Sequence, residues 1–185
     1  MNSGTPNTVF KKAEGLDNVK IVCASGGTAH TVLLDESGNV WTAGNNLHGQ
    51  LGRQTAKNVD SKFEKVADGI SGVKITAIAA GSRYTVLLDE SGNVWTAGSN
   101  GYGELGRETN GMSSSVFGKA DLWGATAAKF IAAGGTTIVI DTDGNVRTSG
   151  INGHGQLGRD TGSESSDSKL LAAVSYTHLT LPTKR

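Results

Sequence analysis

The sequence has few of the residues on which redox, metal and membrane functions depend. Cys23 is the single cysteine among 185 residues, so neither an internal disulfide nor a CxxC site can form, and we expect this thiol to fill space in a core strand. No stretch approaches the roughly 18 apolar residues of a membrane span. The opening residues MNSGTPNTVFKKAEG also lack the apolar region of a signal peptide. These absences predict neither membrane insertion nor secretion.

Neither sign of charge is in excess. Lys plus Arg and Asp plus Glu both number 17, so the formal net charge is zero. A protein that binds a phosphate backbone or an anionic membrane needs a basic field to neutralise it. The sequence therefore predicts no nucleic-acid partner and no membrane partner.

Signatures of catalysis and metal binding are missing as well. The sequence contains no H-E-x-x-H, no G-x-S-x-G and no Walker loop, and the acid pairs at 35–36 and 89–90 stand in repeated turns, where acids are routine. His48 and His154 occupy equivalent places, but neither has a carboxylate or cysteine at ligand spacing beside it, and zinc usually needs three or four converging ligands. We therefore expect no catalytic residue, no cofactor, no metal and no enzyme activity.

Glycine, by contrast, is abundant, with 27 copies against 2 prolines, and an internal repeat explains where the glycines fall. The segment TVLLDESGNVWTAGNNLHGQLGRQT (31–55) aligns with residues 85–109 and more loosely with residues 138–161. Equivalent glycines are 54 and then 52 residues apart, at Gly44, Gly98 and Gly150. A phenylalanine opens each unit, at Phe10, Phe63 and Phe117. The chain is therefore a repeat protein of three units.

Each unit predicts four short strands. The small apolar runs IVCAS and ITAIAA, which end at Gly27 and Gly81, predict buried innermost strands. The pattern TVLLD-ESGN-VWTAG is typical of a hairpin, and FEKVADG, with FKKAEG and FGKADL as its equivalents, favours an outer strand. Helical period with capping signals, which an α-solenoid requires, is missing. Four strands per unit predict an all-β fold of propeller blades.

Two segments, GYGELG (101–106) and GHGQLG (153–158), match the G-x-G-x-x-G pattern of a dinucleotide loop. Such a loop needs a strand before it and a helix after it, because the helix N-terminus supplies free N–H groups to the pyrophosphate. Here RETNG and RDTGS follow, and Leu47 replaces the first glycine in the first unit. The repeat register therefore favours a structural turn over a nucleotide site.

The unit consensus, AAG-x-x-HT-x-x-L-x-x-x-G-x-V-x-x-x-G-x-N-x-x-GQLG, resembles the regulator of chromosome condensation repeat over residues 8–161. The resemblance implies a seven-bladed β-propeller, of which this chain holds three four-stranded antiparallel blades, a partial propeller. The family's histidine is His30 in the first unit and is replaced by Tyr84 and Thr136 in the others. We assign a structural role to the repeated turn residues Gly44, Gly49, Leu51, Gly52, Gly98, Gly103, Leu105, Gly106, Gly150, Gly155, Leu157 and Gly158.

A further departure concerns tryptophan. The family often places a tryptophan before the repeated glycine, where this chain has Ala43, Ala97 and Ser149. We therefore expect packing between blades to depend on Trp41 and Trp95, with Arg147 replacing them in the third unit.

The units and flanking segments divide the chain as follows: an N-terminal extension (1–7), three repeat units (8–58, 59–111 and 112–161), and a polar linker or the start of a fourth unit (162–173). The last twelve residues, VSYTHLTLPTKR (174–185), have no counterpart in any unit and resemble a translated sequencing adaptor, so we interpret them as non-native. Three blades cannot close a ring that usually needs four to eight. Exposed blade edges therefore predict self-association.

Loops that vary while the scaffold repeats are the candidate binding sites. Tyr102 is the favoured contact, because tyrosine is enriched at interface hot spots. Arg53, Arg107 and Arg159 suit either a recognition stripe on one face or solvated or paired side chains at loop starts. The candidate contacts are Asn45, Leu47, His48, Arg53, Asn100, Tyr102, Arg107, Asn152, His154 and Arg159.

These features predict a non-catalytic scaffold for an unidentified protein partner. Two alternatives stay open. The resemblance implies guanine-nucleotide exchange on a Ran-like small GTPase, and the repeats suit a purely structural segment of a larger protein.

Overall fold

The computed structural model describes residues 9–161 and 166–172, which form three four-stranded antiparallel sheets. Blade 1 contains β1 (Ile21–Gly26), β2 (His30–Asp35), β3 (Val40–Asn45) and β4 (Val59–Lys65). Blade 2 contains β5 (Ile75–Ala80), β6 (Tyr84–Asp89), β7 (Val94–Ser99) and β8 (Ser113–Lys119). Blade 3 contains β9 (Ala128–Ala133), β10 (Thr136–Asp141), β11 (Val146–Ile151) and β12 (Ser166–Ala172). The predicted all-β architecture of propeller blades is confirmed.

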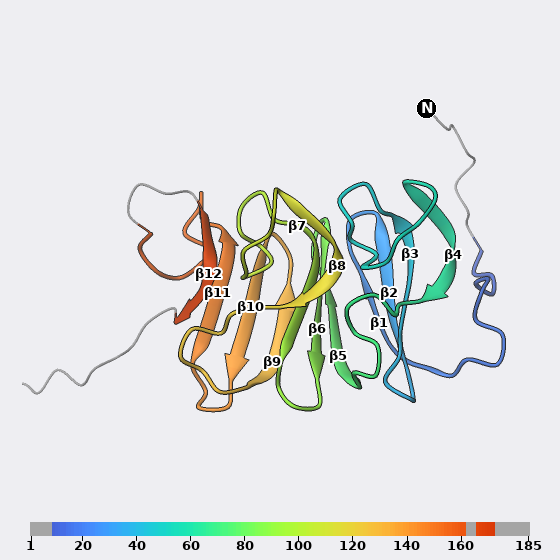
Figure 1. Cartoon of the computed structure of the whole chain (residues 1–185), viewed down its shortest axis with the longest axis horizontal. Helices are drawn as coiled ribbons and strands as arrows, with labels where there is room; N and C mark the ends of the chain where they lie inside the picture. The colour runs from blue at the N-terminus through green and yellow to red at the C-terminus, as the bar shows by residue number, and fades with distance from the viewer. Residues whose placement is uncertain (1–8, 162–165, 173–185) are drawn as a thin grey trace, which may run out of the picture.

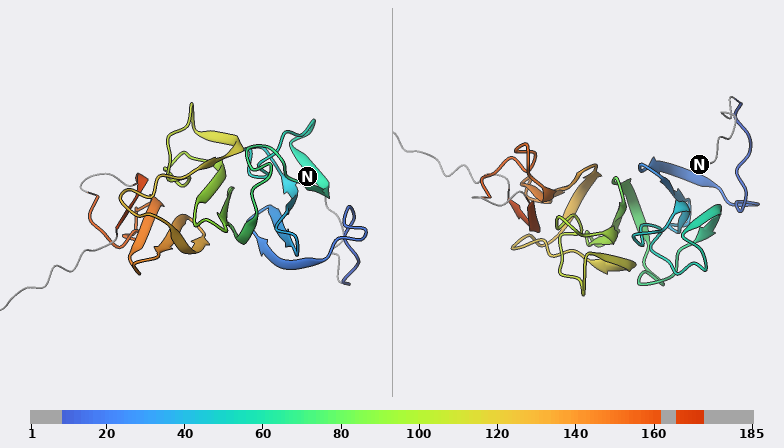
Figure 2. Two further views of the ribbon diagram at one scale, coloured as in Figure 1. Left: turned by 60° about the horizontal axis from the view of Figure 1, so that its bottom comes forward. Right: turned by 90° about the horizontal axis from the view of Figure 1, so that it is seen from above.

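The blades stand side by side along the longest axis of the molecule (Figure 1). Seen from above, the three sheets fan out in an arc (Figure 2). In each sheet the strands are paired in chain order, and β5 contacts β1 and β2 on one side and β9 on the other. Among the described residues, no helix is long and apolar enough to cross a membrane.

The predicted hairpins are confirmed, and an aspartate closes each of them. In blade 1, β2 pairs with β3 so that Leu33 lies opposite Trp41. Oδ1 of Asp35 then accepts hydrogen bonds from the backbone N–H groups of Ser37 and Asn39, each at 2.9 Å. Burial alone would raise the pKa of Asp35, but hydrogen bonds from Trp41 and Asn39 outweigh it and lower the pKa. The repeated acids therefore stabilise turns.

The expected burial of the innermost strands is correct for β5 and wrong for β1. In β5, Ile75, Ile78 and the alanines that follow are buried, whereas most of β1 is exposed, including Val22 and Cys23. The sequences are similar, but β5 has a blade on both sides and β1 contacts a neighbouring blade on one side. Cys23 therefore does not fill a core.

Blade boundaries also differ from the predicted unit boundaries. β4 starts at Val59, the predicted start of the second unit, yet pairs with β3 of blade 1. Phe63 therefore lies in the last strand of a blade rather than opening a unit. Likewise Ser166–Ala172, within the expected linker or fourth unit, pairs with β11 as the outer strand of blade 3.

The segment FKKAEG does not form the expected strand. It runs irregularly beside β4, where Phe63 N donates to the Glu14 carbonyl at 3.2 Å. The expected non-native segment, 174–185, lies outside the described residues.

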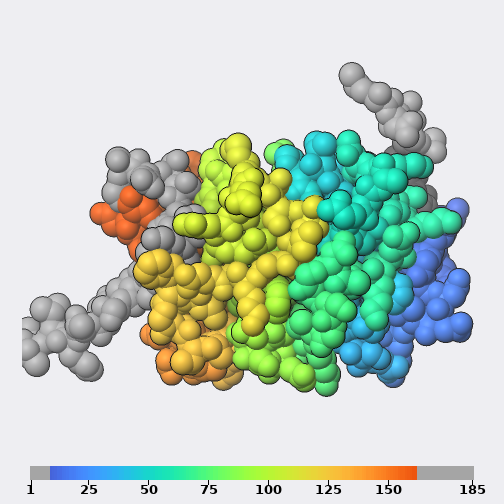
Figure 3. Space-filling view, viewed as in Figure 1, coloured from blue at the N-terminus to red at the C-terminus, as the bar shows by residue number. Residues whose placement is uncertain are grey.

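The core lies mainly in the two seams between blades, and Figure 3 shows blades 1 and 2 packed directly against each other. Each large apolar side chain that is fully buried contributes roughly 1.5–3 kcal/mol. The first seam contains Val32, Leu34, Val40, Val66, Ile70, Ile75, Ile78, Ala80, Leu87, Ala97 and Phe117, with Trp95 packed against it. The second contains Ala79, Tyr84, Val86, Leu88, Val94, Leu105, Ala128 and Val139.

The GQLG turn of blade 1 fits tightly against blade 2. Gly52 has φ +64°, and a Cβ placed there would lie 1.9 Å from Cε2 of Phe117. A larger residue would meet both an unfavourable backbone conformation and the aromatic ring. The leucines of these turns, Leu51, Leu105 and Leu157, are fully buried.

Candidate functional site

The long connections between the third and fourth strands lie on one edge of the blades, the upper edge in Figure 1. We call this the loop edge; it comprises residues 46–58, 100–112 and the described residues 152–161, with the short connections 27–29, 81–83 and 134–135 beside them. The hairpin turns lie on the opposite edge. All the candidate contact residues of the sequence analysis lie on or beside the loop edge.

An asparagine holds each long loop in a fixed shape. In blade 1, Asn46 Oδ1 accepts from Leu51 N at 3.0 Å and Nδ2 donates to the Arg53 carbonyl at 3.1 Å. Asn100 and Asn152 make the same two bonds in the other blades. Two of the candidate contacts, Asn100 and Asn152, therefore serve the loops themselves.

A second set of bonds fixes the loop tip. Gln50 Oε1 accepts from His48 N, and Gln50 Nε2 donates to Asn45 Oδ1, each at 2.9 Å. Asn45 Oδ1 also accepts from Leu47 N at 2.9 Å. The N–H groups of Leu47 and His48 are thus bonded within the loop, while the side chain of Leu47 is 61% exposed. The tip of blade 2 presents Tyr102 in the same way, 51% exposed.

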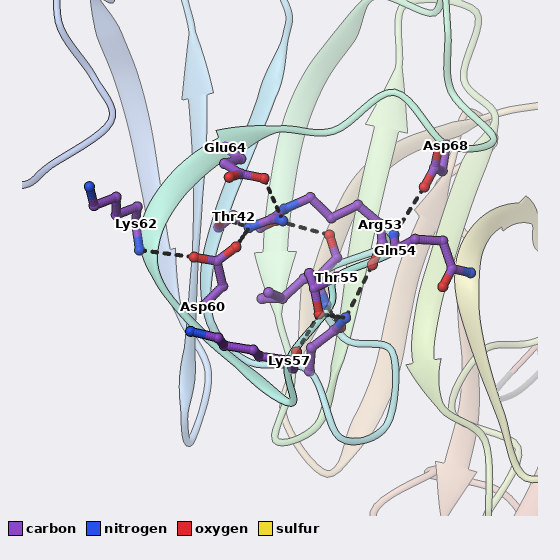
Figure 4. A network of polar contacts seen from close by, with 11 residues as sticks. Thr42, Arg53, Gln54, Thr55, Lys57, Asp60, Lys62, Glu64 and Asp68 are labelled. Carbon is purple, nitrogen blue, oxygen red and sulfur yellow. Dashed lines mark hydrogen bonds and ion pairs between the residues drawn. The ribbon is translucent and has the colours of Figure 1, made fainter.

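The arginine after each turn is structural. Arg53 is buried, with Nη1 2.8 Å from Glu64 Oε2 and Nη2 2.8 Å from Asp60 Oδ2, and Nε donates to Thr42 Oγ1 (Figure 4). The hydrogen bond from Arg53 Nη2 to Asp60 lowers the pKa of Asp60. Arg53 therefore ties its loop to β3 and β4 and cannot reach a partner.

The other two arginines are also turned toward their own blades. Nη2 of Arg107 donates to the Thr96 carbonyl at 3.1 Å, and Nη2 of Arg159 donates to the Thr148 carbonyl at 2.9 Å. These contacts favour the paired arginines over the recognition stripe. The threonine that recurs in VWTAG and VRTSG is the sequence signal for these arginine contacts, because its carbonyl accepts from the arginine in each blade.

A polar contact crosses each seam just below the loop edge. Thr85 Oγ1 of blade 2 donates to the Gln50 carbonyl of blade 1 at 2.7 Å, and His30 Nε2 lies 3.0 Å from the same oxygen of Thr85. Because the hydroxyl has one proton, it accepts from His30. Burial lowers the pKa of His30 to about 4, so the ring is neutral at neutral pH. Thr137 and the Glu104 carbonyl form the equivalent bond in the second seam.

The loop edge presents separate side chains rather than a cluster of metal ligands. Within residues 9–161 and 166–172, no group of three or more His, Cys, Asp and Glu side chains is placed to hold a metal. Among the many exposed side chains of the edge, the large apolar ones are Leu47, Tyr102 and Met112, with exposed His154 and half-buried His48 on the same loops. Such an arrangement can bind another macromolecule.

Known proteins are similar to this chain in sequence or in fold. A 161-residue alignment with the "Protein RCC2 homolog" of Danio rerio is 30% identical and covers 85% of this chain and 31% of the relative. The crystal structure of human WBSCR16 superposes with a TM-score of 0.75 at 20% identity, over 84% of this chain and 38% of that chain. Prp20p from Saccharomyces cerevisiae, studied for its binding to Gsp1p and histones, gives 0.74 at 17% identity, over 84% and 39%.

This chain spans under two fifths of each of these proteins. Two models of the "Regulator of chromosome condensation (RCC1) repeat" match it, one over residues 19–50 and 75–104 and the other over residues 37–88. Together with the three sheets and the recurring turn residues, these matches show that the chain contains repeats of the regulator of chromosome condensation (RCC1) type.

Proposed function

We propose that the chain is a non-catalytic protein-interaction scaffold whose loop edge contacts a protein partner. One observation carries this proposal: two large side chains, Leu47 at 61% and Tyr102 at 51% exposure, stand on loop tips whose backbone N–H groups are held by side-chain hydrogen bonds. Rigid presentation reduces the entropy lost on binding. Exposed apolar groups on a fixed frame favour association.

The contacts that remain for a partner are those not used by the loops. Leu47, His48, Tyr102 and His154 project from the tips, whereas the asparagines and arginines are committed to their own blades. We place the binding energy mainly on Tyr102, because a tyrosine buries a large area at a low cost in rotamer entropy.

The test is affinity capture with quantitative mass spectrometry. The bait is the full chain, either unchanged or carrying Leu47→Ser and Tyr102→Ala together. A matched control carries Glu36→Gln and Ser91→Ala, exposed residues on the hairpin edge. We expect at least one protein to fall about tenfold with the loop variant and to remain with the control. Identical captures by all three baits would contradict the proposal.

A second candidate is guanine-nucleotide exchange on a Ran-like GTPase. It is favoured by the similarity of fold to Prp20p, which was studied for its binding to Gsp1p. A scaffold leaves the release of fluorescent GDP from such a GTPase unchanged, whereas an exchange factor accelerates it. A purely structural segment would show neither exchange nor a partner that depends on the loops.

Self-association is a further part of the proposal. Most of β1 is exposed and includes Val22 at 58% exposure, so a second copy can cover it. Light scattering of the full chain tests this, with Val22→Lys expected to shift the population toward monomer. Monomers at every concentration would exclude it.

A further inference from the structure

A pocket of about 190 Å³ opens at the loop edge where blades 2 and 3 meet. Blade 2 contributes Arg83, Tyr84, Tyr102 and Glu104, and blade 3 contributes the short connection 134–135 with Ile151. The pocket lies beside the exposed ring of Tyr102, so a partner bound at the loop edge would reach it.

The pocket contains a buried acid. Glu104 is 6% exposed, and its Oε2 accepts from Tyr102 N at 2.9 Å while Ser99 Oγ lies 3.5 Å from Oε1. Among the ion pairs of the described residues, none includes Glu104. Burying a carboxylate without a cation is unfavourable. The other two units have the neutral Gln50 and Gln156 here.

Comparison with those glutamines shows that the charge is not needed for the fold. Gln50 Oε1 accepts from His48 N, and Gln156 Oε1 accepts from His154 N at 2.8 Å. Glu104 makes the same backbone bond from Tyr102. A glutamine could therefore make the same bond to Tyr102 N, and the long bond from Ser99 Oγ to Glu104 Oε1 does not neutralise the carboxylate.

A second polar group in the pocket is unpaired. The hydroxyl of Tyr84 is buried and makes no hydrogen bond among the described residues, although Thr137 and Gly134 lie close to it. Burial raises the pKa of Tyr84 to about 12, so the phenol stays protonated. In the first seam, His30 stands in this place and is bonded to Thr85. The Tyr84 oxygen lies in the wall of the second seam near Thr137 and is closed off from solvent.

We propose that this pocket receives the ammonium group of a lysine side chain from the protein partner. The inference rests on the proposed protein-binding role and names the group that the partner inserts. An ammonium supplies three donors and a positive charge, which match the Glu104 carboxylate in the pocket lining. The Tyr102 ring at the rim can cover the methylene stem.

Two features of the pocket bear on which cation binds. A guanidinium pairs best with both oxygens of a carboxylate, but Oε2 of Glu104 already accepts from Tyr102 N, which favours a compact ammonium. The chain's own Arg83 is exposed at the rim and forms no ion pair with Glu104. Its charge opposes an incoming cation, so Arg83→Gln is expected to tighten binding.

The test is an NMR titration of the full chain with the peptide acetyl-Gly-Gly-Lys-Gly-Gly-amide. The amide signal of Tyr102 reports directly, because this N–H is bonded to Glu104. We expect saturable shifts of Tyr102 and Gly134, binding at least about tenfold weaker for Glu104→Gln, and no such shifts with the peptide in which lysine is acetylated.

Several results would overturn the inference: equal binding by Glu104→Gln, equal binding of the acetylated peptide, or preference for an arginine peptide. Failure of the pocket is also distinguishable from failure of the scaffold. If the lysine peptide does not bind while the loop variant still loses a captured protein, the pocket assignment is wrong and the loop-edge proposal stands.

Discussion

Arg147 donates from Nε to Oδ2 of Asp141 across 3.0 Å, where the other two blades use an indole. In blade 2, Trp95 Nε1 makes the same bond to Asp89 at 2.9 Å. In the third blade, Arg147 keeps the N–H donor to the aspartate but replaces the indole ring with a positively charged guanidinium. Its Nη1 also donates to the Trp123 carbonyl. Arg147 therefore replaces tryptophan in a turn bond, a role that the expectation about packing between blades did not include.

Removing this donor should destabilise the protein. Arg147→Ala leaves the buried Asp141 carboxylate without its cation, which is expected to cost about 3 kcal/mol of unfolding free energy in urea titrations. Arg147→Trp is the matched control, because it restores the arrangement of blade 2. The tryptophan variant should recover at least half of the loss; equal instability of both variants would show that the bond is unimportant.

The contact between Gly52 and Phe117 predicts a strong effect of one methyl group. Gly52→Ala adds a steric clash to the cost of a positive φ, and we expect a loss of about 3 kcal/mol. Gly144 has φ +86° with no atom within 4 Å of an added Cβ, so Gly144→Ala should cost only about 1 kcal/mol. Equal losses would show that the seam adapts to the methyl group.

His30 predicts a stability change in mild acid. Its pKa is lowered from 6.5 to about 4 in the folded state, so the unfolded chain binds the proton between these values and the folded chain does not. The contribution of His30 to the free energy of unfolding is therefore full well above pH 6.5 and is lost as the pH falls toward 4. The loss between pH 7 and pH 5 is about 2 kcal/mol.

Denaturant unfolding at the two pH values measures this change. The control is His30→Tyr, because Tyr84 occupies the equivalent site and packs against Gly81 as His30 packs against Gly27. The variant should lose most of the dependence between pH 7 and pH 5. An unchanged slope would assign the effect to other groups.

Arg53 and Arg107 predict different costs for the same substitution. Arg53→Lys cannot reach Asp60, Glu64 and Thr42 together, so we expect a loss of about 2 kcal/mol. Arg107 forms no ion pair among the described residues, and Arg107→Lys should cost about 1 kcal/mol or less. Thermal unfolding in low and high salt measures both losses, because salt weakens ion pairs more than hydrogen bonds to carbonyls. A larger loss of stability for Arg107→Lys than for Arg53→Lys would contradict the role given to the ion pairs.

The sequence by itself determined the repeat, the hairpins and the number of strands in a unit. These features are local: the alternation of TVLLD and VWTAG and the turn chemistry of Asp35 to Asn39 act over fewer than ten residues. It also pointed to Tyr102 and Leu47 as variable loop residues, and the structure places both on exposed tips.

Only the tertiary structure decided which strand closes each blade, which arginines are buried and what crosses the seams. β4 follows a long loop, so no local pattern assigns it to the hairpin before it rather than to the strand after it. The contact from His30 to Thr85 joins residues 55 apart, and Gly150 of blade 3 meets the Glu104 side chain of blade 2. β5 is buried and the similar β1 is mostly exposed. The difference arises because neighbouring blades, rather than the residues of the strand itself, remove β5 from water.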